Sequence, residues 1–361
     1  MKKHILSFIK SIPQTTWLYV FAGVIISIAL GLIAWFWYQS VHEKAREVIT
    51  FDEPQGNSSS TAYCEFSHVL DGVCVASVEE QQTRIIGVMV ENHYEAQPLA
   101  GIAAASLVYE SPVEGGIPRL FAVYKEGTVV AKVGPVRSAR AYYLDWLAEY
   151  GSAMYMHVGG SPEAIDLIEK RQVFDLNEFY RGWYYYRSDD RSAPHNVYSN
   201  SELWESALAR YAPSTTEPFV GWSFRHIDAC TNACTKGVDI IYGGGYDVSW
   251  QFNSSTKQYD RRQFGKFHRD QDGTPYVADT VLIQEVEAKV LDDIGRLGIE
   301  TMGSGKGYIL RDGFLFDATW RKESLTQRTR WYDEQDQEIS LKPGKIWVEI
   351  VTKFQRVEIV E

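Results

Sequence analysis

Two glutamates four positions apart are the residues best suited to acid–base chemistry. Glu110 and Glu114 lie in the segment Y-E-S-P-V-E-G-G, and hydrolysis of a glycosidic bond uses two carboxyl groups on either side of a cleft. His157 and His195 titrate near neutral pH and can exchange protons at the same place. These four residues are the catalytic candidates, and a hydrolase acting on a glycan or an ester is the enzyme they would serve.

Arginines and a glycine turn form a second group, whose chemistry is the binding of an anion. Arg119, Arg137 and Arg140 carry forked guanidinium donors that match a carboxylate or a phosphate. The turn G-G-S-P at 159–162 precedes a predicted helix, and the first N–H groups of a helix attract negative charge. The predicted ligand-binding residues are Asn92, His93, Arg119, Arg137, Ser138, Arg140, Gly159, Gly160, Ser161 and Asn196.

A structural role explains several of these residues without any ligand. Arginine–glutamate pairs often brace loops, and a histidine before Gly-Gly is commonly part of a turn. Ser161 is a good N-cap, Pro162 suits the first helical turn, and Glu163 already places a negative charge there. Ser161 is not expected to be a nucleophile, because the proline after it lacks the N–H that an oxyanion hole uses.

Signatures of cofactor and metal chemistry are missing from the sequence. It contains no G-x-S-x-G elbow, no Walker loop, no H-E-x-x-H and no catalytic-cysteine context. Residues 303–307 (G-S-G-K-G) lack the Ser/Thr and the helix that follow a phosphate loop, so we expect a flexible hairpin loop there. The sequence therefore predicts no cofactor and no metal site, and it leaves open whether the protein is an enzyme.

Residues 84–212 are expected to fold as an α/β domain, because strand-like and helix-like segments alternate. The predicted strands are 84–91, 106–110, 120–125 and 153–158. The predicted helices are 138–150, 162–170 and 201–211, the last with Ser199 as its cap. The polar residues named above lie where strands end or helices begin, and ligands of open α/β sheets bind outside the carboxyl ends of the strands.

Residues 222–357 are expected to form a mainly antiparallel β domain, a small sandwich or a curled sheet. The predicted strands are 237–242, 247–252, 276–285, 307–310, 314–319, 327–332 and 346–352, with an Asp-Gly hairpin turn at 312–313. The aromatic residues here could stack on a sugar or fill the core, and they are Trp222, Trp250, Trp320, Trp331, Trp347, Tyr242, Tyr246, Tyr259 and Tyr332.

The N-terminus has the pattern of a single membrane anchor. Residues 17–38 form 22 uncharged positions with aromatic residues at both ends, and a helix of that length spans about 33 Å. Residues 1–16 contain three lysines and no acid, which predicts a basic cytoplasmic tail and folded domains on the extracytoplasmic side. A cleaved signal peptide is the alternative, but the apolar run is too long for one and lacks small residues at its end. We therefore expect an uncleaved signal-anchor in the cell membrane.

Residues 39–83 are expected to be a linker that includes a cysteine loop. The stretch 50–61 is rich in Ser, Gly, Pro and Asn and has no periodicity. The four cysteines, Cys64, Cys74, Cys230 and Cys234, favour two local disulfides outside the cytoplasm. A four-cysteine zinc site is the alternative, although a C-x9-C spacing is unusual for one. The spacing leaves open whether the short Cys230–Cys234 ring closes.

Length and charge limit the partners. The chain has 361 residues, enough for two domains, and a net charge of −11. Residues 1–38 carry three positive charges and no negative ones, so the remainder carries −14. A nucleic-acid-binding protein would normally be basic, and we expect no nucleic-acid partner. The expected partners are the membrane, through the N-terminal helix, and a cell-envelope polymer or an envelope protein.

Five ordered phrases, ENHYEAQPLAGI, VYESPVEGGI, VGPVRSAR, HVGGSPEA and APHNVY, resemble the motifs of the YerB-type family of bacterial extracytoplasmic proteins. Residues 222–357 resemble the second part of that family more loosely, through YDRRQ, GSGKGYILRDG, ATWRK and LKPGKIWVEI. The resemblance implies a two-part domain of unknown function and no particular activity. Members of the family are often lipoproteins, whereas here a membrane span is expected to anchor the chain.

The function expected from these observations is binding at the cell envelope. We expect a membrane-anchored extracytoplasmic protein that binds an envelope glycan or another anionic polymer, or that scaffolds envelope assembly. One alternative is an envelope glycan hydrolase that uses Glu110 and Glu114. Another alternative is a protein–protein interaction module in which the second domain makes the contact.

Overall fold

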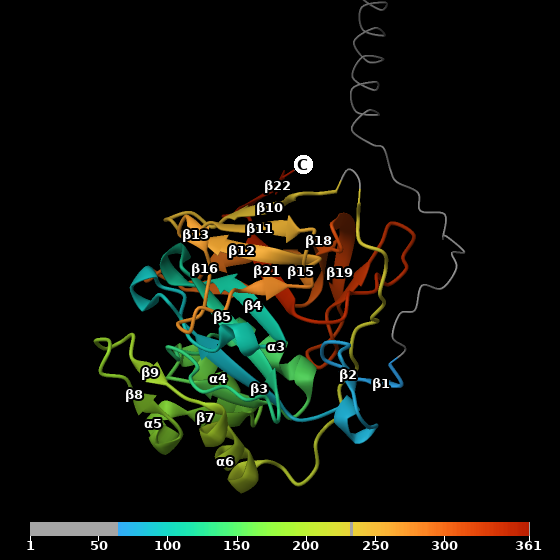
Figure 1. Ribbon diagram of the computed structural model, residues 1–361. Coiled ribbons are helices and arrows are strands. Elements are labelled where there is room, and N and C mark those ends of the chain that lie inside the picture. The colour runs from blue at the N-terminus through green and yellow to red at the C-terminus, as the bar shows by residue number, and fades with distance from the viewer. Residues whose placement is uncertain (1–63, 232–233, 361) are drawn as a thin grey trace, which may run out of the picture. The chain divides into compact units, whose positions relative to one another are not determined.

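The computed structural model describes residues 64–231 and 234–360 (Figure 1). They belong to one compact unit, Ala62–Glu361. The predicted cytoplasmic tail, the membrane span at 17–38 and most of the linker lie outside the described residues. Within the part that is described, no helix has the length and apolar character needed to cross a membrane.

The largest element is a ten-stranded sheet that draws strands from both predicted domains. In spatial order its strands are β20 (Arg330–Tyr332), β19 (Phe314–Lys322), β18 (Gly303–Arg311), β15 (Thr280–Val286), β21 (Ile346–Thr352), β4 (Leu107–Pro112), β5 (Pro118–Lys125), β3 (Ile85–Val90), β6 (Met154–His157) and β7 (Phe174–Asn177). Strand β21 lies parallel between β15 and β4, and β3, β6 and β7 are also parallel. The strands expected in a separate β domain therefore extend the sheet of the first one.

A six-stranded antiparallel sheet forms the second layer. Its strands are β13 (Lys266–Phe267), β12 (Gln258–Gln263), β11 (Val248–Asn253), β10 (Gly237–Ile241) and β22 (Arg356–Val360), with β14 (Val277–Ala278) beside β12. The short pairs are β1 (Phe66–Ser67) with β2 (Cys74–Val75), β8 (Tyr186–Arg187) with β9 (Val197–Tyr198), and β16 (Ala288–Val290) with β17 (Leu297–Ile299). Figure 1 shows β10, β11 and β12 at the end of the molecule opposite α5 and α6.

The predicted helices are confirmed in position, with one change of cap. The helices are α3 (Ala141–Leu147), α4 (Pro162–Lys170), α5 (Glu178–Arg181) and α6 (Ser201–Tyr211). Short 3-10 turns are η1 (Glu79–Gln81), η2 (Tyr94–Ala96), η3 (Ile102–Ala104), η4 (Glu114–Gly116), η5 (Ala148–Tyr150) and η6 (Gly182–Tyr184). Ser161 caps α4 as expected, but Asn200 rather than Ser199 caps α6, because the Ser199 hydroxyl donates to the Tyr184 carbonyl.

Two apolar cores cover the two faces of the ten-stranded sheet. Alternate residues of a strand point to opposite faces, so Val88 on β3 belongs to one core and Met89 to the other. The first core includes Trp250 of the six-stranded sheet and Trp204 of α6, and the second includes Trp146 of α3. The large sheet is thus buried on both sides, which explains the nearly continuous apolar runs of its strands.

The aromatic surface considered for the second part does not form. Trp222, Trp250, Trp320, Trp331 and Trp347 are all buried, as are Tyr242, Tyr246 and Tyr259. The indoles of Trp250 and Trp347 lie 5.2 Å apart in an edge-to-face pair between the two sheets. Trp250, Trp347 and the three tyrosines fill the core between the two sheets, whereas Trp222, Trp320 and Trp331 pack in the core on the other face of the large sheet.

Two local disulfides form, as the sequence favoured, and they include the Cys230–Cys234 ring whose closure the spacing left open. Cys64 is bonded to Cys74 and Cys230 to Cys234, with Cα–Cα separations of 5.4 and 5.6 Å. No free cysteine remains among the described residues. The four-cysteine zinc site is therefore excluded, because each sulfur is already paired.

Candidate functional site

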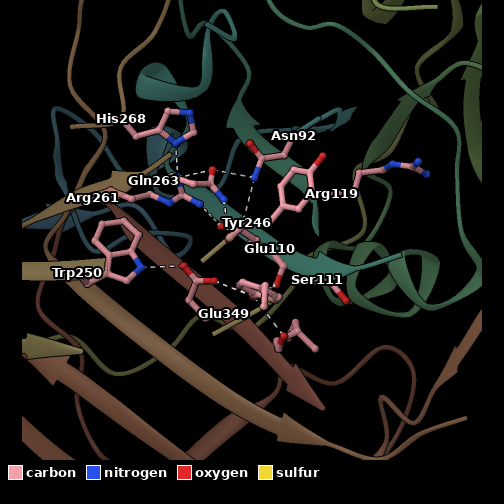
Figure 2. A network of polar contacts seen from close by, with 12 residues as sticks. Asn92, Glu110, Ser111, Arg119, Tyr246, Trp250, Arg261, Gln263, His268 and Glu349 are labelled. Carbon is pink, nitrogen blue, oxygen red and sulfur yellow. Dashed lines mark hydrogen bonds and ion pairs between the residues drawn. The ribbon is translucent and has the colours of Figure 1, made fainter. Parts of the chain in front are cut away.

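Glu110, the first catalytic candidate, belongs to a fully buried network between the two sheets (Figure 2). It lies on β4 directly beside Glu349 on the parallel strand β21, and both side chains face the six-stranded sheet. Arg261 of β12 reaches between the sheets, and its Nη2 donates to Glu110 Oε2 at 2.5 Å. Asn92 Nδ2 donates to the other carboxylate oxygen at 3.0 Å.

Neutral donors surround the second carboxyl group of this network. Trp250 Nε1 and the Tyr242 hydroxyl donate to Glu349 at 2.7 and 2.9 Å. Burial, with the nearby charge of Glu110, raises the pKa of Glu349 to about 8. Burial raises the pKa of Glu110 as well, but the Arg261 ion pair opposes that rise, so we place the proton at neutral pH on Glu349, which has no cation in contact among the described residues.

This burial removes Glu110 from the catalytic candidates. Its side chain is fully enclosed, and its oxygens are occupied by Arg261 and Asn92. A general acid must reach the reacting atoms directly or through one water, and no substrate reaches this position. The pattern Y-E-S-P placed the residue correctly at a strand, but the strand is covered by a second sheet.

Glu114 is also paired with an arginine. Arg140 binds it with two parallel bonds, Nε to Oε1 at 2.7 Å and Nη2 to Oε2 at 2.8 Å. Partial burial opposes ionisation, yet the Arg140 guanidinium holds the pKa of Glu114 below its usual value. A carboxylate kept ionised in this way is a poor proton donor, so the geometry does not support a Glu110–Glu114 hydrolase.

The other predicted arginines are also engaged within the protein. Arg119 is buried, and its Nη1 donates to the Ser138 carbonyl at 2.8 Å. Arg137 forms an ion pair with Glu91 at 3.1 Å, and Glu91 also accepts from His195 Nδ1 at 2.8 Å. The contacts of these arginines therefore agree with the structural role, in which they hold neighbouring loops together.

The glycine turn at 159–162 starts α4 and supports the next strand. The N–H groups of Gly159 and Ala164 donate to the side chains of Asn177 and Ser161, and Ser161 N–H donates to the Ala139 carbonyl. His157 is fully buried, with its ring nitrogens 2.6 Å from Gly159 O and Asp175 Oδ1. Because these donors already have partners, the turn is not an open seat for an anion.

Three further observations concern the remaining predicted ligand-binding residues. Asn196 lies near the surface, where its Oδ1 accepts from Arg187 Nη1 at 3.1 Å. Arg140 and Ser161 line a hollow of about 120 Å³ beside α3 and α4. Gly160 pairs with Ala139 in an isolated parallel bridge and lies at the start of the same turn.

A larger hollow, of about 340 Å³, lies beside β7 and α5. We call it the aromatic hollow, and it is lined by Val173, Phe174, Asp175, Asn177, Tyr180, Arg181 and Tyr211. The Arg181 guanidinium lies 4.2 Å from the centre of the Tyr211 ring, and its buried Nη1 has no hydrogen-bond partner within the described part of the chain. A ligand group in the hollow is one partner that could satisfy this nitrogen.

One exposed aromatic ring, Tyr180, lines this hollow, and two more exposed rings are close to it in the sequence. Phe179, Tyr180 and Trp183 are 66, 73 and 60 % exposed, and they follow one another through α5 and η6. The Phe179 ring lies over Gly159, where an added Cβ would come within 2.8 Å of it. The glycine turn therefore positions the aromatic segment.

The prediction of ligand-binding residues missed this segment. The available signal is the run F-Y-R-G-W-Y-Y-Y at 179–186, with six aromatic residues in eight positions. Tyr184 and Tyr185 of the same run are buried, so spacing alone does not tell which rings face solvent.

Comparison with known protein families shows to which family the chain belongs. A model described as protein of unknown function (DUF3048) N-terminal domain matches residues 70–214, and the corresponding C-terminal domain model matches residues 238–348. The chain belongs to the DUF3048 family. The resemblance drawn from the five motifs is thereby confirmed, and the family has no described activity to transfer.

A relative and a solved structure share this DUF3048 architecture. The Bacillus subtilis (strain 168) protein named "Putative lipoprotein YerB" is 26% identical over 287 residues, covering 77% of this chain and 84% of that protein. The crystal structure of YerB protein from Bacillus subtilis matches with a TM-score of 0.73 and 23% identity, covering 81% of this chain and all of that one. The structural match supports the fold.

The two DUF3048 halves meet in the buried network. Asn92 and Glu110 lie within the N-terminal match, and Arg261 lies within the C-terminal match. Their contacts cross from one half to the other. The polar cluster around Glu110 therefore joins the two halves of the family fold, which is a structural task.

Proposed function

We propose that this DUF3048 protein is anchored to the membrane by residues 17–38 and binds a cell-envelope polysaccharide at the aromatic hollow. The observation that carries the proposal is the hollow itself, where the exposed Tyr180 ring lies with Arg181, whose Nη1 has no partner among the described residues; the exposed Phe179 and Trp183 are close by in the sequence. Exposed apolar patches on a soluble fold usually mark an interaction site. The extracytoplasmic placement draws support from the relative named a lipoprotein and from the two disulfides.

The lining of the hollow suits a sugar polymer that carries negative groups. Flat aromatic rings offer an apolar face to the C–H side of a sugar, and Tyr180 also offers a hydroxyl. Arg181 can donate to a carboxylate or phosphate, Asp175 can accept from a hydroxyl group, and the Asn177 amide nitrogen can donate to one, because its oxygen already accepts two backbone bonds. The hydrolytic alternative finds no support here, because neither Glu110 nor Glu114 lines the hollow.

Retention on immobilised cell-wall polysaccharide tests this proposal. The full chain, purified in detergent, is compared with Tyr180→Ala and Trp183→Ala. Each substitution is expected to lower the apparent affinity by roughly 3- to 10-fold, the range of one aromatic contact. Arg181→Gln should lower it further at low salt, because a charged contact to the polymer is lost.

A matched control distinguishes binding at this site from non-specific adsorption to the polysaccharide. Phe354 is 52 % exposed and follows β21, outside the hollow, so Phe354→Ala should leave retention unchanged. Equal retention of the Tyr180→Ala/Trp183→Ala double variant and the unmodified chain would contradict the proposal. Capture of a protein rather than the polymer by the same rings would also contradict the proposal, and it would place a protein-binding surface in the first domain rather than in the second.

A further inference from the structure

We propose that His93, Glu95 and His195 form a binding site for a divalent transition-metal ion, with zinc as the reference ion. One ligand atom from each residue lies within 4.8 Å of the others. His93 and Glu95 lie at the start of η2, just after β3, and His195 lies between β8 and β9. Two of the motif phrases, ENHYEAQ and APHN, are thus brought together by the fold, and the imidazole rings stack with centroids 5.4 Å apart.

Glu91 sets the orientation of His195. Its Oε2 lies 2.8 Å from His195 Nδ1, so that nitrogen carries the proton and donates it. The lone pair of Nε2 then faces Glu95 Oε2 at 3.3 Å. Two acceptors that face each other repel unless a cation lies between them. A carboxylate behind a histidine is also the usual outer partner of a metal-binding imidazole.

Two of the three ligand separations are close to those around a tetrahedral ion, and all three ligand atoms lie within 4.8 Å of one another. Zinc binds nitrogen and oxygen at about 2.0–2.2 Å, which places neighbouring ligand atoms about 3.3–3.5 Å apart. The observed separations from Glu95 Oε2 are 3.3 Å to His195 Nε2 and 3.7 Å to His93 Nδ1. The bond that His93 Nδ1 accepts from the Glu95 N–H is long, at 3.3 Å, so a small ring rotation frees this nitrogen for the ion.

Charge and access also favour a cation. Arg137 neutralises Glu91, so with neutral imidazoles the cluster keeps the single negative charge of Glu95. The Glu95 side chain is 54 % exposed, which lets an ion enter from solvent and keep a water as its fourth ligand. The occupant that competes with a metal is a proton on His195 Nε2, and the experiment distinguishes the two.

The site is tested by titrating zinc into the full chain in detergent and measuring the heat of binding by calorimetry. We expect one equivalent of zinc per chain. Glu95→Gln and His195→Gln should weaken binding by more than about 100-fold, whereas Glu91→Gln should weaken it by about 10- to 100-fold, as loss of an outer partner does. The matched control is His226→Gln, which changes an exposed histidine outside the cluster and should leave the affinity unchanged.

A variant that misfolds would also lose zinc binding, so a second measurement is made on the unmodified chain. Zinc should shift the ring signals of His93 and His195 in an NMR spectrum and leave those of His226 in place. The proposal is overturned if the chain binds no zinc, which leaves the proton as the occupant, or if Glu95→Gln binds as tightly as the unmodified chain. Polysaccharide retention through Trp183 does not depend on this result, so the two proposals fail separately.

Discussion

At the scale of single residues, two neighbouring glutamates lie near one arginine, which pairs with only one of them. Glu110 and Glu349 are paired across adjacent parallel strands, and only Glu110 contacts Arg261. Two buried carboxylates this close cannot both ionise beside a single positive charge, so one keeps its proton. Bonds from Trp250 and Tyr242 favour the ionised form of Glu349, but burial and the charge of Glu110 outweigh them, and Glu349 is the protonated carboxyl group.

This protonation predicts a pH dependence of stability. An unfolded glutamate has a pKa of about 4.3, whereas burial raises the pKa of Glu349 to about 8 in the folded chain. Between these values the folded state holds a proton that the unfolded state has released. Stability from this group is therefore fully present below about pH 4 and is lost as the pH rises toward 8, by up to about 1.4 kcal/mol per pH unit.

Glu349→Gln imitates the protonated form and should remove this slope. Urea denaturation at pH 6, 7 and 8 gives the free energy of unfolding of the variant and of the unmodified chain. The difference between their changes with pH is the contribution of Glu349. Glu358→Gln is the control, because Glu358 lies on the exposed strand β22. A Glu349→Gln variant that loses stability with pH as steeply as the unmodified chain would refute the assignment of the proton.

At the scale of elements, the segment 303–307 is a strand rather than the expected hairpin loop. It begins β18, which pairs with β19 along its whole length and with β15. The glycines leave room for indole rings: an added Cβ would lie 2.6 Å from Trp320 Nε1 at Gly305 and 2.5 Å from Trp331 at Gly307. A Gly-rich strand interior often marks such a close approach.

Gly307→Ala is therefore expected to destabilise the chain. The new methyl group would meet Trp331 and the backbone carbonyl of Ile283, 2.6 Å away, and neither can move without disturbing the sheet. We expect a loss of about 2–3 kcal/mol in the free energy of unfolding, measured by urea denaturation. Gly182→Ala is the matched control, because nothing lies within 4 Å of its added Cβ. Equal effects of the two substitutions would contradict the packing argument.

At the scale of the whole molecule, the two DUF3048 halves share one sheet. The last long strand, β21, pairs with β4 of the first half on one side and with β15 of the second half on the other. The first core likewise takes residues from both halves. Neither half buries its own apolar faces, because each covers the other.

A fragment that ends at residue 214 should therefore not fold alone. It lacks β21, which leaves the β4 edge unpaired, and it lacks the second sheet that covers Val108 and Tyr124. Thermal unfolding followed by circular dichroism should show no cooperative transition for the fragment and one for the full chain. Mixing it with a fragment that starts at residue 215 should restore the transition. Independent cooperative unfolding of the first fragment would refute the interleaved architecture.

Local spacing in the sequence determined the elements of this protein, and only the tertiary structure decided which side chains are accessible. The strand at 346–352, the Ser161 cap and the Cys64–Cys74 disulfide depend on residues close together in the chain, so their pattern was sufficient. The spacing left the closure of the Cys230–Cys234 ring open, and only the structure decided it. Glu110 reads locally as a polar residue on a strand, and its burial follows from Arg261 and Glu349, far away in the sequence. Whether a side chain is buried depends on which distant segments pack against that face of the strand. The alternation of apolar and polar residues along one strand does not show which segments these are.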